Sequence, residues 1–343
     1  MKIFDAHVHY AASQGTELFL RVLDQQQIDS CVLACIEQAG GHDTTREALA
    51  LQAAHPGRFH VMGGLRQSAY FQYAGDPAGL GRSLTEQVQA LLDAGCDGIK
   101  MLEGKPDIRK KTPIPDFDTE AWLPFWERMS QEQIPVLWHV NDPADFWDAE
   151  KINPYARSRG WFYGPEIIGN QEQYRQVEAV LNRFPTLRIQ FAHMLFLTDD
   201  LPRLSQWMRR FPNICVDLTP AVEIYLDLSK RLEEARSFFE EFGSRILLGT
   251  DIGSRSCIAD PPRPIDAQES EARLALILPF LQTPYREPYL LVPDGKYLYH
   301  IDPTEMRGLG LSESQLQKIC GENARRFYGE TGFRPGETPQ TKA

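Results

Sequence analysis

Short apolar runs alternate with amphipathic stretches along nearly the whole chain. Eight of the runs are rich in Val, Ile and Leu and are bounded by Pro, Gly or charged residues. This pattern is typical of parallel strands that are buried on both faces. The runs cover residues 2–9, 30–37, 58–65, 98–102, 134–140, 187–193, 213–218 and 245–251.

The intervals between these runs carry helix signals. Apolar positions at helical spacing predict helices over residues 48–54, 84–94, 119–133, 171–184, 201–211, 231–242 and 312–328. Thr44 with Glu47, and Ser312 with Gln315, fit capping boxes at the first and last of them. Eight strands that alternate with helices predict a single (β/α)8 barrel. An open dinucleotide-binding sheet would need a Gly-rich turn after the first strand, where this chain has His-Val-His-Tyr-Ala-Ala.

One stretch after the eighth strand departs from this alternation of strands and helices. Residues 253–306 form a longer connection with a helical patch at 268–281 and a candidate hairpin that joins 289–292 to 296–300 around Pro-Asp-Gly. We interpret this connection as an insertion over the barrel mouth, inside one domain of residues 1–331. Residues 332–343 are predicted to form a flexible tail.

Composition and charge narrow the class of protein. Of the 343 residues, 24% are charged and 42% are hydrophobic, as in globular proteins, and the net charge of −11 argues against nucleic-acid or anionic-membrane partners. The chain contains no apolar run of about 18 residues that would predict a membrane span. Its six cysteines lack C-x-x-C spacing, and the N-terminus has the pattern of a strand rather than of a signal peptide. The prediction is a cytoplasmic protein with free thiols, and homo-oligomerisation stays open.

Histidines mark the ends of several predicted strands. His7 and His9 are two residues apart on the first strand, so they leave the same face. His139 ends the fifth strand, His193 the sixth, and Asp251 the eighth. The carboxyl ends of barrel strands converge on one mouth. Imidazoles and a carboxylate gathered there would form a pocket suited to a divalent metal ion.

Simpler interpretations of these histidines exist. A single histidine at a strand end is more often a hydrogen-bonded core or rim residue, and alternation alone can produce a His-x-His pair. The coincidence of four histidines at strand ends nevertheless favours a metal site. The other four histidines are given structural roles: His42, His55, His60 and His300.

This set of residues resembles the amidohydrolase superfamily. The similarity is to the branch that contains metal-dependent decarboxylases, hydratases and lactonases. It rests on the strand-end residues above and on three further motifs: Asp97-Gly-Ile-Lys-Met, Phe184-Pro-Thr-Leu-Arg-Ile and Glu322-Asn-Ala-Arg-Arg-Phe-Tyr. The resemblance implies one zinc-like ion held by His7, His9, His139 and Asp251, with His193 near the reacting group. Zn²⁺ is favoured, with Mn²⁺ as the alternative.

Such a site supports hydrolysis. A metal-bound water with a pKa lowered to about 7 supplies hydroxide at neutral pH. Asp251 would bind the ion and transfer protons, and His193 would polarise a carbonyl oxygen. The leading hypothesis is a hydrolase of a small, carboxylate-bearing amide, ester or lactone. The alternative is a lyase, either a decarboxylase or a hydratase, that acts on an aromatic or related acid. A barrel that binds a metabolite without turnover is a more remote alternative.

Three further residues are candidates for the site. Lys100 lies on the fourth strand, where binuclear members of the superfamily carry a carboxylated lysine that bridges two metals; the simpler reading is an ion pair with a barrel carboxylate. Arg66, after the third strand, and Arg255, after Asp251, are candidates for binding a substrate carboxylate.

Overall fold

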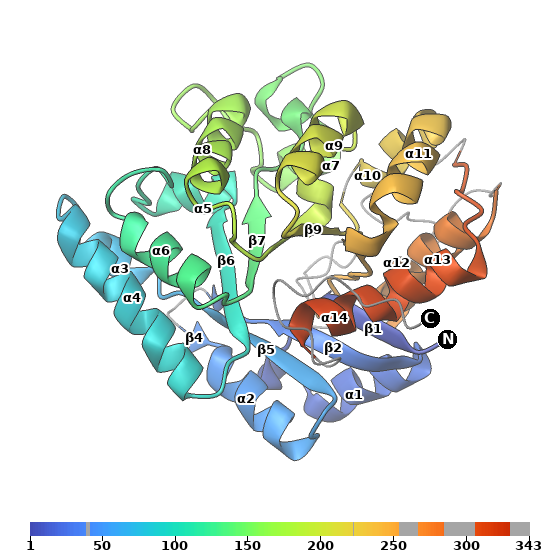
Figure 1. The fold of residues 1–343 in the computed structure, drawn as a ribbon, viewed down its shortest axis with the longest axis horizontal. Helices are drawn as coiled ribbons and strands as arrows, with labels where there is room; N and C mark the ends of the chain where they lie inside the picture. Colours follow the sequence, from blue (N-terminus) through green and yellow to red (C-terminus); the bar gives the residue numbers. More distant parts are fainter. Residues whose placement is uncertain (39–41, 222, 254–266, 285–305, 330–343) are drawn as a thin grey trace, which may run out of the picture.

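The computed structural model contains one eight-stranded parallel barrel (Figure 1). The strands follow the order β1-β2-β5-β6-β7-β8-β9-β10. Their bounds are Ile3–Val8, Ile28–Ala34, Phe59–Gly64, Gly98–Gly104, Val136–Val140, Ile189–Phe191, Ile214–Asp217 and Ile246–Leu247. The segment after β10 closes the ring, because the Ala6 N–H donates to the Leu248 carbonyl at 2.7 Å and the His9 N–H to the Ile252 carbonyl at 2.8 Å. The predicted (β/α)8 barrel is confirmed.

The structure describes residues 1–38, 42–221, 223–253, 267–284 and 306–329. Within the predicted insertion, the helical patch is present as α12, Ala267–Gln282. The predicted hairpin, the tail and Arg255 lie outside the described residues. Among the helices that are described, none is both long and apolar enough to cross a membrane.

Helices surround the barrel and pack on its outer face (Figure 1). The longer ones match the predicted intervals: α2 Thr45–Ala54, α4 Pro77–Asp93, α6 Leu123–Gln131, α8 Asn170–Arg183, α9 Leu201–Arg210 and α11 Leu232–Phe242. The remaining helices and a small hairpin were not predicted from the sequence: α1 Thr16–Gln25, α3 Ser68–Gln72, α5 Pro106–Lys111, α7 Pro154–Ser158, α10 Ile224–Lys230, and β3 Glu37–Gln38 with β4 His42–Asp43.

The two predicted capping boxes have different outcomes. At the start of α13, Glu313–Gln317, the Ser312 and Gln315 pair forms a reciprocal box, as predicted. The box at Thr44 is wrong, because the Thr44 hydroxyl bonds the backbone of Ile36 instead of capping α2. Side chains of this kind hydrogen-bond whichever backbone groups lie nearest, and here those groups belong to the preceding loop.

Aromatic packing fixes the layer between the barrel and its helices. Trp138 points outward from β7 and contacts Trp126 of α6, with ring centroids 4.8 Å apart, and Phe117, at 4.9 Å. All three side chains are fully buried. Because side chains alternate along a strand, the outward direction of Trp138 sends its neighbour His139 to the inner face.

Candidate metal centre

The mouth of the barrel holds a cavity of about 640 Å³. Six of the predicted site residues line it: His7, His9, Lys100, His139, His193 and Asp251. They come from β1, β6, β7 and the segments that follow β8 and β10. The convergence expected of strand ends is therefore observed.

His7 is oriented by a buried carboxylate that sequence analysis did not select. Its Nδ1 lies 3.1 Å from Asp217 Oδ2, and both side chains are buried. Because Asp217 can only accept when ionised, the hydrogen of His7 is on Nδ1 and the lone pair is on Nε2. Burial, and then the nearby Lys100 ammonium, lower the His7 pKa to about 4, so the ring is neutral at pH 7. Burial alone would raise the pKa of Asp217, but its hydrogen bond with His7 and the adjacent imidazoles hold that pKa well below its usual range.

His7, His9 and Asp251 form a compact ligand set. One nitrogen from each imidazole and one carboxylate oxygen all lie within 4.8 Å of one another. Asp251 Oδ1 is 3.2 Å from His9 Nε2 and 3.9 Å from His7 Nε2. Two imidazoles and one carboxylate are a common three-ligand set of catalytic zinc sites. The donor chemistry and the His7 lone pair on Nε2 both fit a divalent ion.

Local backbone and an arginine hold Asp251 in place. Its backbone has φ +61°, a left-handed conformation, and its N–H donates to the His7 carbonyl at 2.8 Å. Arg273 of α12 reaches its Oδ2 at 3.4 Å and bonds Glu269 at 2.8 Å. Beside Asp251, a Cβ on Gly249 would come within 2.4 Å of the Thr219 hydroxyl oxygen and 3.1 Å of the His7 Cβ. Glycine is therefore required where this segment passes His7.

His139 lies beside the compact set rather than in it. Its Nε2 is 3.0 Å from the Asn141 carbonyl oxygen and 3.6 Å from Asp142 Oδ1. Because the carbonyl can only accept, Nε2 carries the hydrogen and Nδ1 has the lone pair. Burial, and then the Lys105 ammonium, lower the His139 pKa to about 4.

His193 follows β8 in a left-handed turn, with φ +56°. Its Nδ1 lies 3.2 Å from the Thr219 carbonyl, and its backbone N–H donates to Asp217 at 2.8 Å. Its ring centroid is 4.9 Å from that of His139 and 5.7 Å from that of His7. Burial lowers its pKa well below the usual range, so the lone pair of His193 is on Nε2 at neutral pH.

Lys100 is buried among these groups. Its Nζ lies 3.2 Å from His7 Nε2. Burial lowers its pKa to about 8, although Asp217 and Asp251 oppose that shift. The lysine therefore contacts the same lone pair that a metal ion would bind.

A cationic and aromatic wall, formed by Lys105, Tyr155, Arg159 and Trp161, also lines the cavity. Arg159 packs its guanidinium over Tyr155 and Trp161, at 5.9 and 5.7 Å from the ring centroids. Lys105 Nζ lies 4.9 Å above Trp161, but it is also bonded to both oxygens of Asp142 at 2.9 and 3.2 Å. Lys105 is therefore neutralised within the protein, whereas the Arg159 guanidinium forms no ion pair with a carboxylate of the described residues. Of the two, Arg159 is the better placed to bind a substrate anion.

Of the two arginines proposed from sequence, Arg255 lies outside the described residues. Arg66 is exposed and is not among the described residues that line the cavity. Asp217 could have been found from sequence, because it ends a predicted strand just as His139 and Asp251 do. Arg159 and Arg273 lie on a loop and a helix far along the chain, where no local spacing marks them.

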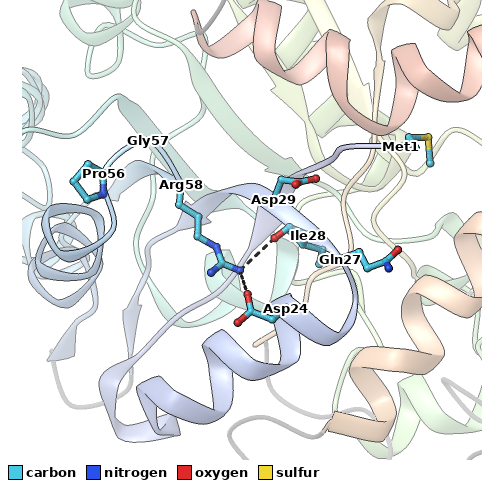
Figure 2. Close-up of a pocket in the computed structure, with 8 residues that line it drawn as sticks. All are labelled: Met1, Asp24, Gln27, Ile28, Asp29, Pro56, Gly57 and Arg58. Carbon is cyan, nitrogen blue, oxygen red and sulfur yellow. Dashed lines mark hydrogen bonds and ion pairs between the residues drawn. The ribbon is translucent and has the colours of Figure 1, made fainter.

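The opposite end of the barrel has a second, open hollow of about 770 Å³ (Figure 2). It lies near the starts of β2 and β5, and Figure 2 shows Arg58 bonded to Asp24 and to the Ile28 carbonyl. No histidine lines it among the described residues. Although this hollow is larger, the chemistry-bearing groups are at the mouth, where barrel active sites are found.

Comparison with known families agrees with this geometry. A family model described as amidohydrolase matches residues 5–329. No curated protein matches the chain.

Solved structures share the fold at low sequence identity. An uncharacterised TIM-barrel protein from Bordetella bronchiseptica is 16% identical, with a TM-score of 0.59 over 97% of this chain and 100% of that one. A probable 2-pyrone-4,6-dicarboxylic acid hydrolase from Acinetobacter baumannii, with citric acid bound, is 12% identical, with a TM-score of 0.53 over 96% of this chain and 100% of that one. A dihydroxybenzoic acid decarboxylase from a Polaromonas species, with manganese and an inhibitor bound, is 14% identical, with a TM-score of 0.51 over 95% of this chain and 96% of that one.

Proposed function

This chain belongs to the amidohydrolase family, and we propose that it is a metal-dependent hydrolase of a small, carboxylate-bearing amide, ester or lactone. The observation that carries the proposal is the compact set of His7, His9 and Asp251, open to the 640 Å³ cavity. A binding barrel without turnover would not need two imidazoles and a carboxylate gathered at one point.

We assign the ion to His7, His9 and Asp251, with His139 as the fourth ligand through Nδ1 after a local adjustment. When bound, the ion would act as a Lewis acid and lower the pKa of a coordinated water. Asp217 keeps the His7 lone pair on Nε2, and His9, followed by Arg273, favours the ionised form of the Asp251 carboxylate. We propose one ion, zinc before manganese, with Lys100 as an unmodified ammonium; the bound manganese of the Polaromonas enzyme supports the alternative metal.

Two groups can move protons. Asp251 is the proposed base that takes a proton from water and passes it to the leaving group. His193 presents an unprotonated Nε2, because its Nδ1–H is directed at the Thr219 carbonyl. This arrangement supports a hydrogen-bond acceptor or second base. It supports less well the carbonyl-polarising role expected from sequence, since a neutral His193 has no free donor.

Arg159 is the proposed anchor for the substrate carboxylate. Its guanidinium is part of the cavity lining and stacks on two aromatic rings. A guanidinium can bind a carboxylate through two parallel hydrogen bonds, and the rings beside it offer flat apolar contact. The pocket therefore favours a flat anion over an extended, neutral chain.

The same pocket favours a second candidate, a lyase that decarboxylates or hydrates an aromatic acid. The aromatic wall would hold the ring of such a substrate, and the Polaromonas relative is a decarboxylase. Hydrolysis and decarboxylation differ in the solvent atom that enters the product: an oxygen atom in hydrolysis, and a hydrogen atom in decarboxylation.

An isotope experiment separates these candidates. Purified protein is incubated with a panel of aromatic lactones, esters, amides and hydroxybenzoates in ¹⁸O-labelled water and, separately, in D₂O. Hydrolysis places one ¹⁸O in a new carboxylate, whereas decarboxylation releases carbon dioxide and places deuterium on the ring. The Asp251→Asn variant is the matched control. Tight binding of panel members by both proteins without product from either would support the non-catalytic alternative.

A further inference from the structure

We propose that Tyr328 and Gln190 are positioning residues for His7, connected to it by a buried chain of hydrogen bonds through the barrel interior. The inference rests on the proposed metal site. It extends that site from the mouth to the C-terminal helix α14, Asn323–Tyr328, which packs against the opposite end of the barrel (Figure 1).

The buried series consists of three consecutive hydrogen bonds, from Tyr328 through Gln190 and Asp217 to His7. The Tyr328 hydroxyl donates to Gln190 Oε1 at 2.6 Å. Gln190 Nε2 donates to Asp217 Oδ2 at 2.7 Å and also contacts the Ala6 carbonyl at 3.0 Å. The same oxygen of Asp217 accepts from His7 Nδ1 at 3.1 Å. The four side chains that form the chain are all buried.

The direction of each hydrogen bond fixes the next one. Burial raises the pKa of Tyr328 well above its usual value, so its hydroxyl keeps its proton and donates. The Gln190 amide must then place its oxygen toward Tyr328 and its NH₂ toward Asp217. A flipped amide would direct oxygen at both the Asp217 carboxylate and the Ala6 carbonyl, which is unfavourable in a buried site. Asp217 is thereby held where it accepts from His7, and the His7 lone pair stays on Nε2.

The C-terminal segment is well anchored at this end of the barrel. Asn323 Nδ2 donates to the Gly243 and Ile246 carbonyls at 2.7 and 2.8 Å, and the Leu248 N–H donates to the Ile319 carbonyl at 2.9 Å. The Tyr328 ring stacks on Phe4, with centroids 6.1 Å apart and an interplanar angle of 9°. Because Phe4 is on β1, this stacking fixes the position of the Tyr328 hydroxyl relative to the strand that carries His7.

Zinc affinity tests the inference. We expect Gln190→Met to weaken Zn²⁺ binding by about 10-fold, the low end of the effect of a direct loss of a metal ligand's partner, because Gln190 bonds that partner, Asp217, and not His7 itself. Tyr328→Phe, one link further away, should weaken it by about 3- to 10-fold, less than that direct loss. The matched control is Tyr70→Phe, which removes another buried hydroxyl, bonded to Glu103 at 3.0 Å and outside the chain. Affinity is measured by competition with a chromogenic chelator, using the full chain stripped of metal.

A double-mutant cycle distinguishes positioning from general destabilisation. If Tyr328 acts through Gln190, then Tyr328→Phe added to Gln190→Met weakens zinc binding no further. Equal affinity of Tyr328→Phe and wild type, or additive losses in the double variant, would overturn the inference. Should Gln190→Met not fold, the comparison of Tyr328→Phe with Tyr70→Phe still decides. A wild-type protein that binds no zinc would instead reject the proposed function itself.

Discussion

The two ends of the barrel are built differently. At the mouth, six of the eight non-glycine residues with positive φ in the described chain follow β7, β8 and β10: Asn141, His193, Met194, Leu195, Phe196 and Asp251. Such conformations are uncommon for residues with side chains and are held by surrounding contacts. They point His193 and Asp251 into the cavity, and buried hydrogen bonds hold both residues.

At the other end of the barrel, an ion pair and stacked aromatic rings hold the structure together. Arg58 pairs with Asp24, whose side chain is 64% exposed, and the Tyr328 ring stacks on Phe4. The difference indicates that conformational strain is concentrated where polar groups must meet, while the opposite end contributes stability. Substitutions at the mouth should therefore affect chemistry far more than stability, and those at the bottom that lie outside the Tyr328–Gln190 hydrogen-bond chain should do the reverse.

The largest effect is expected for Asp251→Asn. Asparagine tolerates the left-handed backbone at this position, so the shape of the site is kept while the basic carboxylate is lost. Loss of a general base typically lowers the rate by 10² to 10⁴, and weaker metal ligation adds to this. Turnover and metal content of the variant are measured together with its melting temperature. An active variant would remove Asp251 from the mechanism.

His193→Asn should have the next largest effect. Its backbone is also left-handed, and asparagine preserves the N–H that donates to Asp217. We expect kcat and kcat/KM to fall together by about 10²-fold, with most of the metal retained. Loss of metal in proportion to activity would show instead that His193 is itself a ligand.

The pH dependence of stability should also distinguish the two ends. The folded-state pKa values of His7 and His139 are about 4, below the ordinary 6.5. Between pH 6.5 and 4 these two histidines bind protons in the unfolded chain but not in the folded chain, so they lower the free energy of unfolding as the pH falls. Asp5 and Glu103, whose folded-state pKa values are raised to about 7 by burial, act in the opposite direction. The loss is on the order of 3 kcal/mol for each histidine. Urea unfolding of the metal-free protein at pH 7 and pH 4.5 measures it.

A matched variant assigns this pH dependence to the mouth. His139→Gln removes one titrating imidazole and should reduce the loss between the two pH values by the share of that residue, on the order of 3 kcal/mol. If its pH dependence equals that of the wild type, acid sensitivity originates elsewhere in the molecule.

The smallest effect is expected at the bottom hollow. Arg58→Ala removes the ion pair between the half-buried Arg58 and the exposed Asp24, together with the hydrogen bond to the Ile28 carbonyl, and should lower the free energy of unfolding by about 1–2 kcal/mol. Zinc affinity and kcat/KM should be unchanged. A clear loss of either would mean that the hollow in Figure 2 communicates with the mouth.

Sequence patterning was sufficient for the barrel and for the residues at its mouth. Apolar runs reveal parallel strands because both faces of each strand are buried, and the strand-end rule located His7, His9 and Asp251. The closing strand β10 is only Ile246–Leu247, shorter than its apolar run, because the segment beyond it joins β1 through separate backbone hydrogen bonds.

Other parts of the site were not visible in the sequence. Arg159, Arg273 and Tyr328 come from a loop and two helices that only tertiary folding brings to the barrel. Hydrogen-bond chains such as the one through Gln190 join residues 138 positions apart, and no local periodicity records them. The sequence pattern therefore locates candidate metal ligands at strand ends, but it does not locate the residues from other segments that hydrogen-bond or pair with them.

The most direct test of the account is the metal content of the purified protein and of two variants. Elemental analysis should find about one equivalent of zinc or manganese per chain in the wild type, and little in His7→Asn or His9→Asn. Two equivalents, with a carboxylated Lys100 seen by native mass spectrometry, would replace the one-ion site with a binuclear one. A wild-type protein without divalent metal, or variants that retain it fully, would contradict the central claim that the mouth of this barrel is a metal centre.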